Sequence, residues 1–476
     1  MNMNSISAVK PGSPPQLAGK RVTVIGLGRE GVALVRFLAS KGAQVTVSDQ
    51  KAASQLAENL REIQGLPVTL SLGQNRVEDA VGADILFLSP GVPLWLPPVK
   101  AAKEGGVPIS SLTQLFFQLC RAPIIGITGS SGKTTTTALI GEILKAAGST
   151  VVVGGNIGLP LIEMVESIPP RAWVVLELSS FQLDVMAQSP QVSAITNVTP
   201  NHLDIHSSME AYVSAKKNIF RFQGTEDVII LNYDDPVTRA MASECRGRVW
   251  YFSRDYALEE GAFVHNGWIK WRQDQHQTPI MPLCQIKLLG LHNRYNVLAA
   301  SAVSTVCGVQ PQVIAQTVAQ FSGVEHRLEL VRELDGVKYY NDSIATSPER
   351  SRAGVLSFQE PVILLAGGRE KHLPLDAWGQ AVHEHCVAIV LFGESAEALE
   401  WALHTEWKGQ NRGPGAPPVF RLATLEEAVT LAQSLAQPGQ VVLLSPACLS
   451  FDAFRNFEER GQVFKALVHQ LRPMKD

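Results

Sequence analysis

The sequence lacks the cysteine patterns that usually build a scaffold or a metal site. Its six cysteines, among 476 residues, stand far apart, with no C-x-x-C pair and no companion histidine spacing. This excludes a dense disulfide framework and a structural zinc motif. We expect reduced thiols, which are typical of a cytoplasmic protein.

Long apolar runs and concentrated positive charge are also missing. No run of about 18 uninterrupted apolar residues occurs, so no membrane-spanning helix is predicted. Residues 1–18 have no apolar signal segment, and we expect a disordered tail there. The net charge of −3 and the lack of a Lys/Arg block argue against a nucleic-acid partner. We therefore expect a cytoplasmic monomer that acts on small molecules.

Short apolar runs that end in glycine or polar residues recur along the whole chain. They include VTVIG, DILFLS, PIIGITG, WVVLELS, SAITNVT, DVIILN, PVILLAGG, AIVLFG and VVLLSP. Strands that are apolar on both faces are typical of parallel sheets covered by helices, so the chain is predicted to be α/β. Its length requires several cores. We expect a Rossmann-like domain at 19–121, a central P-loop domain with a mostly parallel sheet at 122–323, and a Rossmann-like domain at 324–476. A long helical pattern from Asn293 to about Phe321 precedes the last boundary.

The first apolar run breaks into Gly26-x-Gly28-x-x-Gly31, and Asp49 ends the second run, AQVTVSD. A strand, a glycine loop and a helix in this order form a diphosphate cradle, most often for a redox dinucleotide. The pattern alone is a weak signal. An NAD-binding redox or regulatory protein and a protein that binds another diphosphate both remain open at this point.

A second glycine loop carries a more specific signal. GITGSSGKT, residues 126–134, fits G-x-x-x-x-G-K-[ST] between an apolar strand and a helical stretch. In such a loop the backbone amides wrap phosphate oxygens, the lysine neutralises charge and the hydroxyl ligates Mg²⁺. The sequence predicts a nucleoside-triphosphate site formed by Gly129, Ser130, Ser131, Gly132, Lys133, Thr134 and Thr135.

Polar residues that could complete a metal site follow two later strands. Glu177 ends the run WVVLE, and His202, Asp204 and His206 cluster in NHLDIH, with a spacing that is not a zinc signature. Glu177 and one histidine are expected to share Mg²⁺ with Thr134. The alternative is that the histidines only cap or brace a polar loop.

The next helix carries a lysine on its apolar face. Ser207 and Glu210 form a capping box that predicts a helix over SMEAYVSAKKNIF. Lys216 falls at the centre of the apolar stripe, whereas Lys217 lies on its flank. A lysine at such a position must reach water, pair with an anion or lower its pKa, so a bland packing role and a functional role both remain open.

Taken together and in order, the motifs resemble those of the Mur ligases, the ATP-dependent amide-forming enzymes of peptidoglycan precursor synthesis. The matching motifs are GITGSSGKTT, GGNIG, ELSSFQLD, NHLDIH, SAKKNIF, LLGLHNRYN, EHRLE, NDSIATSP, AGGREK and LSPACLSFDAFRNFEERG, and the resemblance covers residues 20–470. Within the family, NDSIATSP and the last motif most resemble the member that adds D-glutamate to UDP-N-acetylmuramoyl-L-alanine. A family member that adds another amino acid and a folylpolyglutamate-synthase-like enzyme are the alternatives.

The resemblance implies a ligase that works through an acyl phosphate with two Mg²⁺ ions. It implies catalytic roles for Lys133, Glu177, His202 and Lys216, with Lys216 carbamylated by CO₂ and ligating metal together with Thr134, Glu177 and His202. It implies ATP contacts from Asn293, Asn296, Arg327 and Asp342. It implies UDP-substrate contacts from Gly28, Arg29, Glu30, Asp49, Ser89, Pro90, Gly91 and Asn156. It implies D-glutamate contacts from Thr346, Lys371, Ser450 and Phe457. Helix capping by the two asparagines, and ordinary loop and core roles for Ser450 and Phe457, are the structural alternatives.

Two positions depart from the pattern of the family. Asn201 stands where some relatives carry aspartate, and Ile344 stands where some relatives carry lysine. The second departure implies that Lys371 or another cation binds more of the D-glutamate carboxylate.

Overall fold

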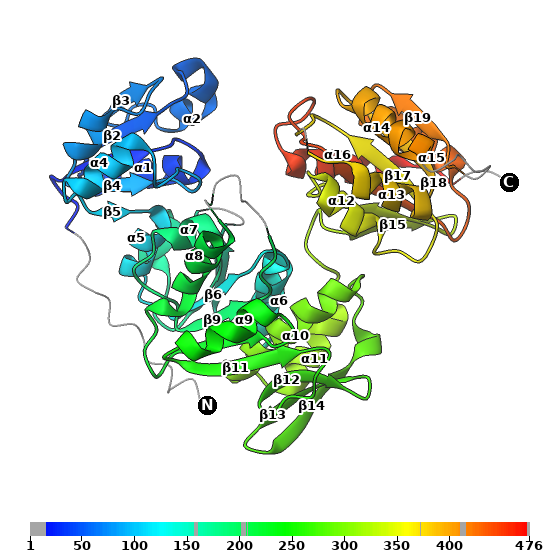
Figure 1. Cartoon of the computed structure of the whole chain (residues 1–476), viewed down its shortest axis with the longest axis horizontal. Helices are drawn as coiled ribbons and strands as arrows, with labels where there is room; N and C mark the ends of the chain where they lie inside the picture. The colour runs from blue at the N-terminus through cyan, green and yellow to red at the C-terminus, as the bar shows by residue number, and fades with distance from the viewer. Residues whose placement is uncertain are drawn as a thin grey trace. The chain divides into compact units, whose positions relative to one another are not determined.

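The structure, a computed structural model, describes residues 16–156, 160–200, 206, 208–371, 373–409 and 416–473. It separates into two compact units. Unit 1 is Met1–Ile286 with Arg294–Ala319, and unit 2 is Lys287–Asn293 with Gln320–Asp476. Unit 1 contains two sheets and unit 2 one, and helices flank each of them (Figure 1). The α/β prediction is confirmed.

The first sheet of unit 1 has the order β3-β2-β1-β4-β5, and all its pairs are parallel. Its strands are β1 (Arg21–Ile25), β2 (Gln44–Asp49), β3 (Val68–Leu72), β4 (Ile85–Leu88) and β5 (Ile109–Ser110). The helices are α1 (Arg29–Ser40), α2 (Ala57–Glu62), α3 (Val77–Val81), α4 (Pro97–Glu104) and α5 (Leu112–Leu119). The strand order reverses between β1 and β4, and ligands of such sheets bind at the carboxyl ends of the strands beside this point.

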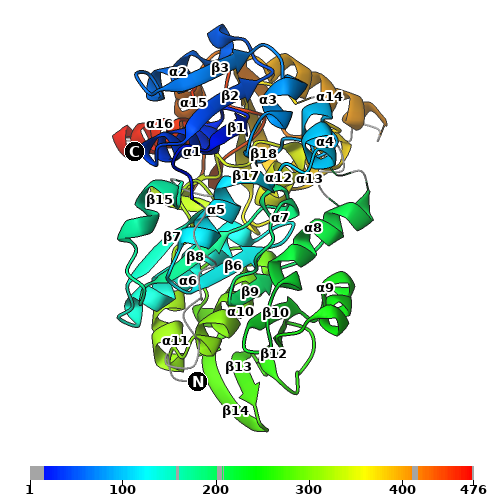
Figure 2. The ribbon, with the colours of Figure 1, turned by 90° about the vertical axis from the view of Figure 1, so that its left-hand side faces the viewer.

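The second sheet has the order β14-β13-β12-β11-β10-β9-β6-β8-β7. Its parallel strands are β6 (Ile124–Thr128), β7 (Val151–Gly155), β8 (Trp173–Glu177), β9 (Val192–Ile195), β10 (Val228–Asn232), β11 (Arg248–Ser253) and β12 (Gly261–His265). β13 (Trp268–Gln273) and β14 (His276–Pro282) then add an antiparallel hairpin, which projects from the end of the sheet (Figure 2). The helices of this part are α6 (Lys133–Ala146), α7 (Ser180–Asp184), α8 (Met209–Arg221), α9 (Pro236–Ala240), α10 (Leu291–Val306) and α11 (Pro311–Gln320).

The helical pattern predicted from Asn293 to about Phe321 is confirmed, and it is divided into two helices, α10 and α11, because Gly308 turns the chain with φ +85° and Pro311 cannot continue a helix. The predicted cap of helix α8 was wrong by one position: Ser208 is its capping residue, and its hydroxyl accepts from the Ala211 amide. Ser207, the predicted cap, lies outside the described residues.

The sheet of unit 2 has the order β15-β16-β20-β17-β18-β19. Apart from the antiparallel β15–β16 pair, its neighbouring strands are parallel. The strands are β15 (Glu329–Leu334), β16 (Val337–Asn341), β17 (Val362–Gly367), β18 (Cys386–Phe392), β19 (Val419–Leu422) and β20 (Val441–Ala447). The helices are α12 (Pro348–Val355), α13 (Asp376–His385), α14 (Ala396–Gly409), α15 (Leu425–Leu435) and α16 (Phe457–Gln470).

Each face of this last sheet has its own apolar core. Trp378 and Leu399 belong to the core on the side of α12, α13 and α14, whereas Val429 and Phe464 belong to the core on the side of α15 and α16. Burial of both faces explains why VILLAG and VVLLSP are continuous apolar runs and do not alternate. The carboxyl ends of β16, β20 and β17 therefore meet at one edge of the sheet.

Candidate active site

The second glycine loop has the strand–loop–helix setting that a phosphate site needs. It joins β6 to α6, and Gly132 caps the helix with φ +80°. A Cβ at Gly132 would lie 2.1 Å from Asn296 Oδ1, so only glycine fits this position. The unpaired amides at the start of a helix bind anions. The loop is thus built as a phosphate cradle.

Lys133 lies over this loop. Its Nζ donates to the carbonyl oxygens of Gly129 (2.9 Å) and Ser130 (3.1 Å). The Ser131 amide donates to Asn197 Oδ1 at 3.0 Å, which fixes the loop to the end of β9. The Lys133 ammonium is therefore held beside the loop amides, so both can contact one phosphate chain.

Glu177 and Thr134 form the oxygen pair that was predicted to hold Mg²⁺. Glu177 ends β8, pairs with Ile127 of β6 in the sheet register and is buried. Its Oε2 accepts from Thr134 Oγ1 at 2.7 Å, and its Oε1 accepts from Asn156 Nδ2 at 3.0 Å. Carboxylate and hydroxyl oxygens are the hard ligands that Mg²⁺ prefers, so these residues fit the ion. Asn156, expected at the UDP substrate, orients this carboxylate.

Lys216 is fully buried beside the same loop, with 1 % of the residue exposed. Its Nζ donates to the Gly129 carbonyl at 2.9 Å and lies 4.5 Å from the centre of the Tyr212 ring. Burial lowers its pKa well below 10.5; the charge of Lys133 lowers that pKa further, while Glu177 acts the other way. The side chain does not reach water, so it is not a lysine that extends its charge past an apolar face. A buried amine with a lowered pKa is chemically suited to react with CO₂.

The histidine cluster is only partly described. His202, the predicted metal ligand, lies outside the described residues, as do Asn201 and Asp204. His206 Nε2 lies 2.9 Å from Ser180 Oγ, and its ring stacks on Phe181 with centroids 5.2 Å apart. These contacts agree with the bracing role that was the alternative for His206.

The glycines of the first loop have different tasks. A Cβ at Gly31 would lie 2.1 Å from the carbonyl oxygen of Gly26, and Ser89 Oγ donates to that oxygen at 2.6 Å. A Cβ at Gly28 would meet nothing within 4 Å. Gly26 and Gly31 are therefore needed for close packing, while Gly28 leaves open space at the amino end of α1. Asp49 braces the loop by accepting from the Leu27 amide at 2.8 Å.

Glu30, expected at the UDP substrate, makes a contact that the sequence did not reveal. Its Oε1 accepts from Gln182 Nε2 at 2.8 Å, and Gln182 belongs to the capping box at the start of α7. Its Oε2 is buried and has no hydrogen-bond partner among the described residues. Burial raises the pKa of Glu30 to about 7, against the smaller opposing effects of Arg29 and Gln182. The carboxyl group thus joins the first glycine loop to the segment that follows Glu177.

A cavity of about 330 Å³ lies beside this contact. The segment after β4, which includes Ser89, Pro90 and Gly91, forms one part of its lining. Phe181, Gln182 and His206 form another (these three follow β8). The cavity is large enough for part of a small-molecule substrate. It borders Ser89, Pro90 and Gly91, which were predicted to contact the UDP substrate, and the segment that carries Gln182 and His206.

In unit 2, three loops at the carboxyl ends of β16, β20 and β17 are bonded to one another. The Ala447 amide donates to the Ala345 carbonyl at 2.9 Å, and the Arg369 amide donates to the Leu449 carbonyl at 2.8 Å. These loops carry Thr346, Ser450 and Lys371, three of the four residues predicted to contact D-glutamate. The structure therefore brings together residues that are about a hundred positions apart in the sequence.

Arg460 of α16 is the centre of this arrangement, a role that no sequence pattern predicted. It is fully buried, and its guanidinium donates to Ser343 Oγ (3.0 Å) and to the carbonyls of Ser343 (2.9 Å), Gly367 (3.3 Å), Cys448 (3.3 Å) and Leu449 (3.3 Å). Burial lowers its pKa to about 10. One side chain thus clamps all three loops.

Four other residues that were predicted to contact substrates make hydrogen bonds within the protein. Phe457 begins α16, and its carbonyl accepts from Ser343 Oγ at 2.8 Å. Asp342 is buried and accepts from Ser445 Oγ at 2.7 Å; burial raises its pKa to about 7, although Ser445 and Arg327 lower it. Asn293 Nδ2 donates to the Leu289 carbonyl at 2.6 Å, a local contact of the kind that its capping alternative predicts. Asn296 Oδ1 accepts from Thr136 Oγ1 at 3.5 Å, close to Gly132.

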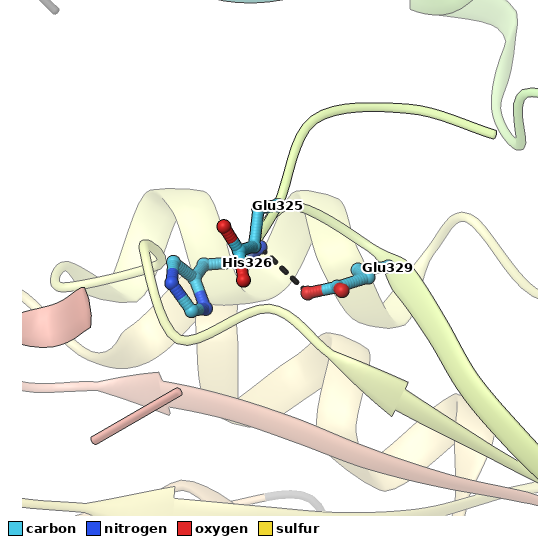
Figure 3. A group of neighbouring side chains, drawn as sticks. All are labelled: Glu325, His326 and Glu329. Atoms are coloured by element: carbon cyan, nitrogen blue, oxygen red, sulfur yellow. Dashed lines mark hydrogen bonds between the residues drawn. The ribbon is translucent and has the colours of Figure 1, made fainter. Parts of the chain in front are cut away.

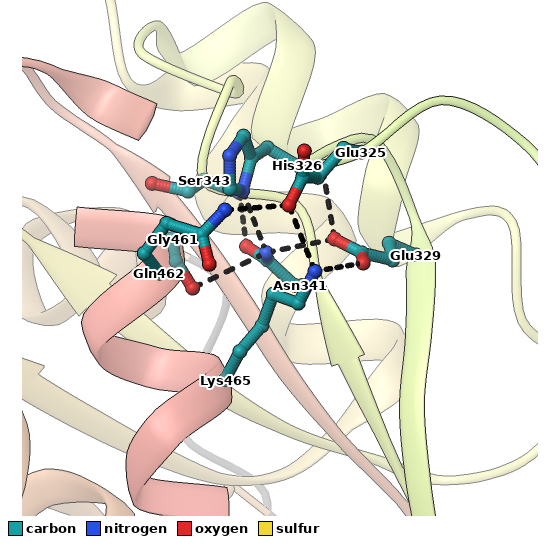
Figure 4. Close-up of polar contacts among 8 residues, drawn as sticks. All are labelled: Glu325, His326, Glu329, Asn341, Ser343, Gly461, Gln462 and Lys465. Atoms are coloured by element: carbon teal, nitrogen blue, oxygen red, sulfur yellow. Dashed lines mark hydrogen bonds and ion pairs between the residues drawn. The ribbon is translucent and has the colours of Figure 1, made fainter. Parts of the chain in front are cut away.

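A second polar cluster in unit 2 has the dimensions of a metal site but is already filled. The ligand atoms of Glu325, His326 and Glu329 lie within 4.8 Å of one another (Figure 3). Lys465 Nζ donates to Glu325 at 2.9 Å and to Glu329 at 2.6 Å, and Asn341 Nδ2 lies 2.9 Å from His326 Nδ1 (Figure 4). The ammonium supplies the positive charge, so we assign this cluster to joining α16 to the EHRLE segment.

All six cysteines are free thiols, as their scattered positions in the sequence predict. Among the described helices, none combines the length and the apolar character needed to span a bilayer.

Comparison with known proteins gives three family matches along the chain. Residues 20–111 match the model described as "Mur ligase MurD-like, N-terminal domain", residues 127–304 match "Mur ligase middle domain", and residues 326–448 match "Mur ligase, glutamate ligase domain". The three α/β parts of the fold are thus the three domains of one family.

Curated relatives match over nearly the whole chain. A UDP-N-acetylmuramoylalanine–D-glutamate ligase of Symbiobacterium thermophilum is 49% identical over 95% of this chain and 98% of its own. A ligase of the same name from Acetivibrio thermocellus is 45% identical over 96% of this chain and 97% of its own. Among solved structures, UDP-N-acetylmuramate-alanine ligase of Thermotoga maritima has a TM-score of 0.58 at 17% identity, covering 94% of this chain and 99% of its own. That last likeness shows the shared fold.

Proposed function

Because this chain belongs to the Mur ligase family, we propose that it joins D-glutamate to UDP-N-acetylmuramoylalanine with conversion of ATP to ADP and phosphate, in peptidoglycan precursor synthesis. One observation carries the proposal. Lys133, Thr134, Glu177 and the buried Lys216 gather around a single phosphate loop, in a chain 49% identical to a ligase of that name.

The chemistry explains why such a loop is needed. An oxygen of the alanyl carboxylate attacks the γ-phosphorus of ATP, the bond to the β-phosphate oxygen breaks, and ADP leaves. The amine nitrogen of D-glutamate then attacks the acyl carbon, phosphate leaves, and the nitrogen loses a proton. The first step is mainly a matter of position and charge neutralisation, which the loop amides and Lys133 provide. Thr134 and Glu177, together with His202, would hold Mg²⁺, which supplies further neutralisation at the phosphates.

Lys216 completes this site as a carbamate. Its neutral amine attacks CO₂, a C–N bond forms and one proton is released, so that a buried amine becomes a carbamate whose oxygens would be able to hold Mg²⁺ together with Thr134 and Glu177. The burial of Nζ and the lowered pKa support this assignment, because only the unprotonated amine reacts. A ¹³CO₂-labelled sample should show a carbamate carbon signal that disappears in Lys216→Ala.

The first glycine loop is assigned to the uridine diphosphate of the substrate. Open space at Gly28, the amino end of α1 and Arg29 provide an anion site, and the adjacent cavity has room for the sugar and alanyl part. A fluorescence titration tests the redox alternative: tight NADH binding without binding of the UDP substrate would overturn the assignment.

The amino-acid substrate is assigned to the clamped loops of unit 2. Thr346, Lys371 and Ser450 share the edge that Arg460 organises, and Phe457 begins the helix that carries Arg460. A panel of amino acids in a coupled ADP-release assay tests the specificity. D-glutamate should give the highest kcat/KM, and a clear preference for another amino acid would assign the chain to a different reaction of the family.

The cellular location and the oligomeric state of the protein are two further parts of the proposal. Free thiols and the use of ATP support a cytoplasmic location, and we propose a monomer as the working form. Light scattering of the purified protein at several concentrations tests the second statement.

A further inference from the structure

The basic side chains at the clamped edge of unit 2 fall into two kinds. Arg369 is satisfied, because its Nε and Nη2 each donate to the Glu394 carboxylate at 3.0 Å. Arg460 is satisfied by Ser343 Oγ and by backbone carbonyls. These two residues hold the loops in place and have little capacity left for a ligand.

Arg350 and Lys371 are different. Both are exposed, and in the described part of the chain neither has a carboxylate within ion-pair distance. The hydrogen bond recorded for the Arg350 side chain runs from Nη1 to the Ile344 carbonyl and is long, 3.5 Å. Lys371 makes no side-chain hydrogen bond to a described residue. Among the described residues, neither of these two cations has an ion-pair partner at this edge.

The two cations also act on each other and on the same site. Although Lys371 is exposed as a residue, partial desolvation of its ammonium, followed by the charge of Arg350, lowers its pKa. Arg350 also contributes to lowering the pKa of the buried Asp342, whose raised value results mainly from burial. Like charges in one site raise its energy until an anion is bound between them. The edge is therefore prepared for negative charge.

The backbone that carries Arg350 is firmly held. Ser351, the next residue of α12, donates to the Ser445 carbonyl at 2.7 Å and accepts from Trp378 Nε1 at 3.0 Å. The helix is thus fixed to β20, while the side chain of Arg350 extends outward beside Ile344. A fixed backbone that carries a guanidinium with one long hydrogen bond and no carboxylate partner is a suitable arrangement for a planar, two-point contact with a carboxylate.

We propose that Arg350 and Lys371 each bind one of the two carboxylates of D-glutamate, and that Arg350 supplies the cation that Ile344 does not. The inference rests on the proposed function and names a specificity-determining residue for it. It also gives a reason for the dicarboxylate substrate, because a monocarboxylate leaves one of the two cations unpaired.

The variant Arg350→Gln tests this inference in the full chain. We expect KM for D-glutamate to rise about 10- to 100-fold, as for loss of a charge-assisted contact, with KM for ATP and for the UDP substrate changed less than about twofold. Arg350→Lys should lie between the wild type and Arg350→Gln. Arg352→Gln is the matched control, because Arg352 is exposed on the same helix and lies two residues away, on another face.

Two analogues separate the carboxylates. D-glutamine lacks the γ-charge and D-isoglutamine lacks the α-charge. Arg350→Gln should lose discrimination against one of these amides, and Lys371→Gln should lose discrimination against the other. An unchanged KM for D-glutamate in Arg350→Gln, or loss of discrimination against the same amide in both variants, would overturn the inference. Failure of the proposed function looks different, because the wild type itself would then not use D-glutamate.

Discussion

Glu30 provides a quantitative test, because its carboxyl group is buried at the first glycine loop and one of its oxygens has no partner among the described residues. Burial raises its pKa from an ordinary 4.5 to about 7. Between these two values the folded chain holds a proton that the unfolded chain has released. The free energy of unfolding therefore falls as the pH rises through this window, and below the unfolded pKa the effect is absent.

The size of the effect follows from the two pKa values. At about 1.4 kcal/mol per pH unit, ionisation of Glu30 costs the folded state about 3 kcal/mol once the pH exceeds both values. Glu30→Gln keeps the shape and the contact with Gln182 but has no proton to release. The difference in unfolding free energy between Glu30→Gln and the wild type should grow by about 3 kcal/mol, in favour of the variant, from pH 4 to pH 8.

Urea unfolding at several pH values measures this difference. If the amino-terminal part of unit 1 unfolds in a transition of its own, that transition is the one to compare. Glu58→Gln, at an exposed position of α2, is the control and should run parallel to the wild type. If the unfolding free energies of Glu30→Gln and the wild type differ by the same amount at pH 4 and at pH 8, the reasoning is refuted. That result would mean that Glu30 is ionised in the folded protein.

Three further predictions follow from single residues. Lys216→Ala should abolish amide formation, and added bicarbonate should restore part of it by supplying a carboxylate-like ligand; full activity of the variant would exclude the carbamate role. Arg460→Met should lower the unfolding free energy by about 3–5 kcal/mol, because several buried carbonyls lose their donor, and should raise KM for D-glutamate; an unchanged melting temperature would contradict the clamp. Lys465→Met should cost about 1 kcal/mol at pH 7 and less once the pH falls below the pKa of Glu325, which the hydrogen bond from Lys465 lowers from 4.5, because the protonated carboxyl group no longer pairs with the ammonium; equal losses at neutral and acidic pH would contradict the charge argument.

The sequence was most informative where function and packing depend on neighbouring residues. The apolar runs predicted the strands because burial on both faces leaves a continuous local signature. The position of Lys216 on the apolar stripe placed it on a packed face but left open whether its amine reaches water, and the structure buries it. Lys217 on the flank pairs with Glu244 as a surface residue does. The placement of Glu177 at the end of β8 also followed from the run that precedes it.

The residues that were missed depend on contacts between distant segments. Arg460 is buried because Ser343, Gly367 and Cys448 come together at one sheet edge, which depends on the order β16-β20-β17. A charged residue in a polar helix is normally exposed, and nothing near it in the sequence indicates otherwise. The contact between Glu30 and Gln182 spans 152 positions and is hidden for the same reason.

The most direct test of the central claim is ADP release with each substrate omitted in turn. We predict release only when ATP, Mg²⁺, UDP-N-acetylmuramoylalanine and D-glutamate are all present, with one amide bond formed per ADP. Release at the same rate with and without D-glutamate would contradict the account.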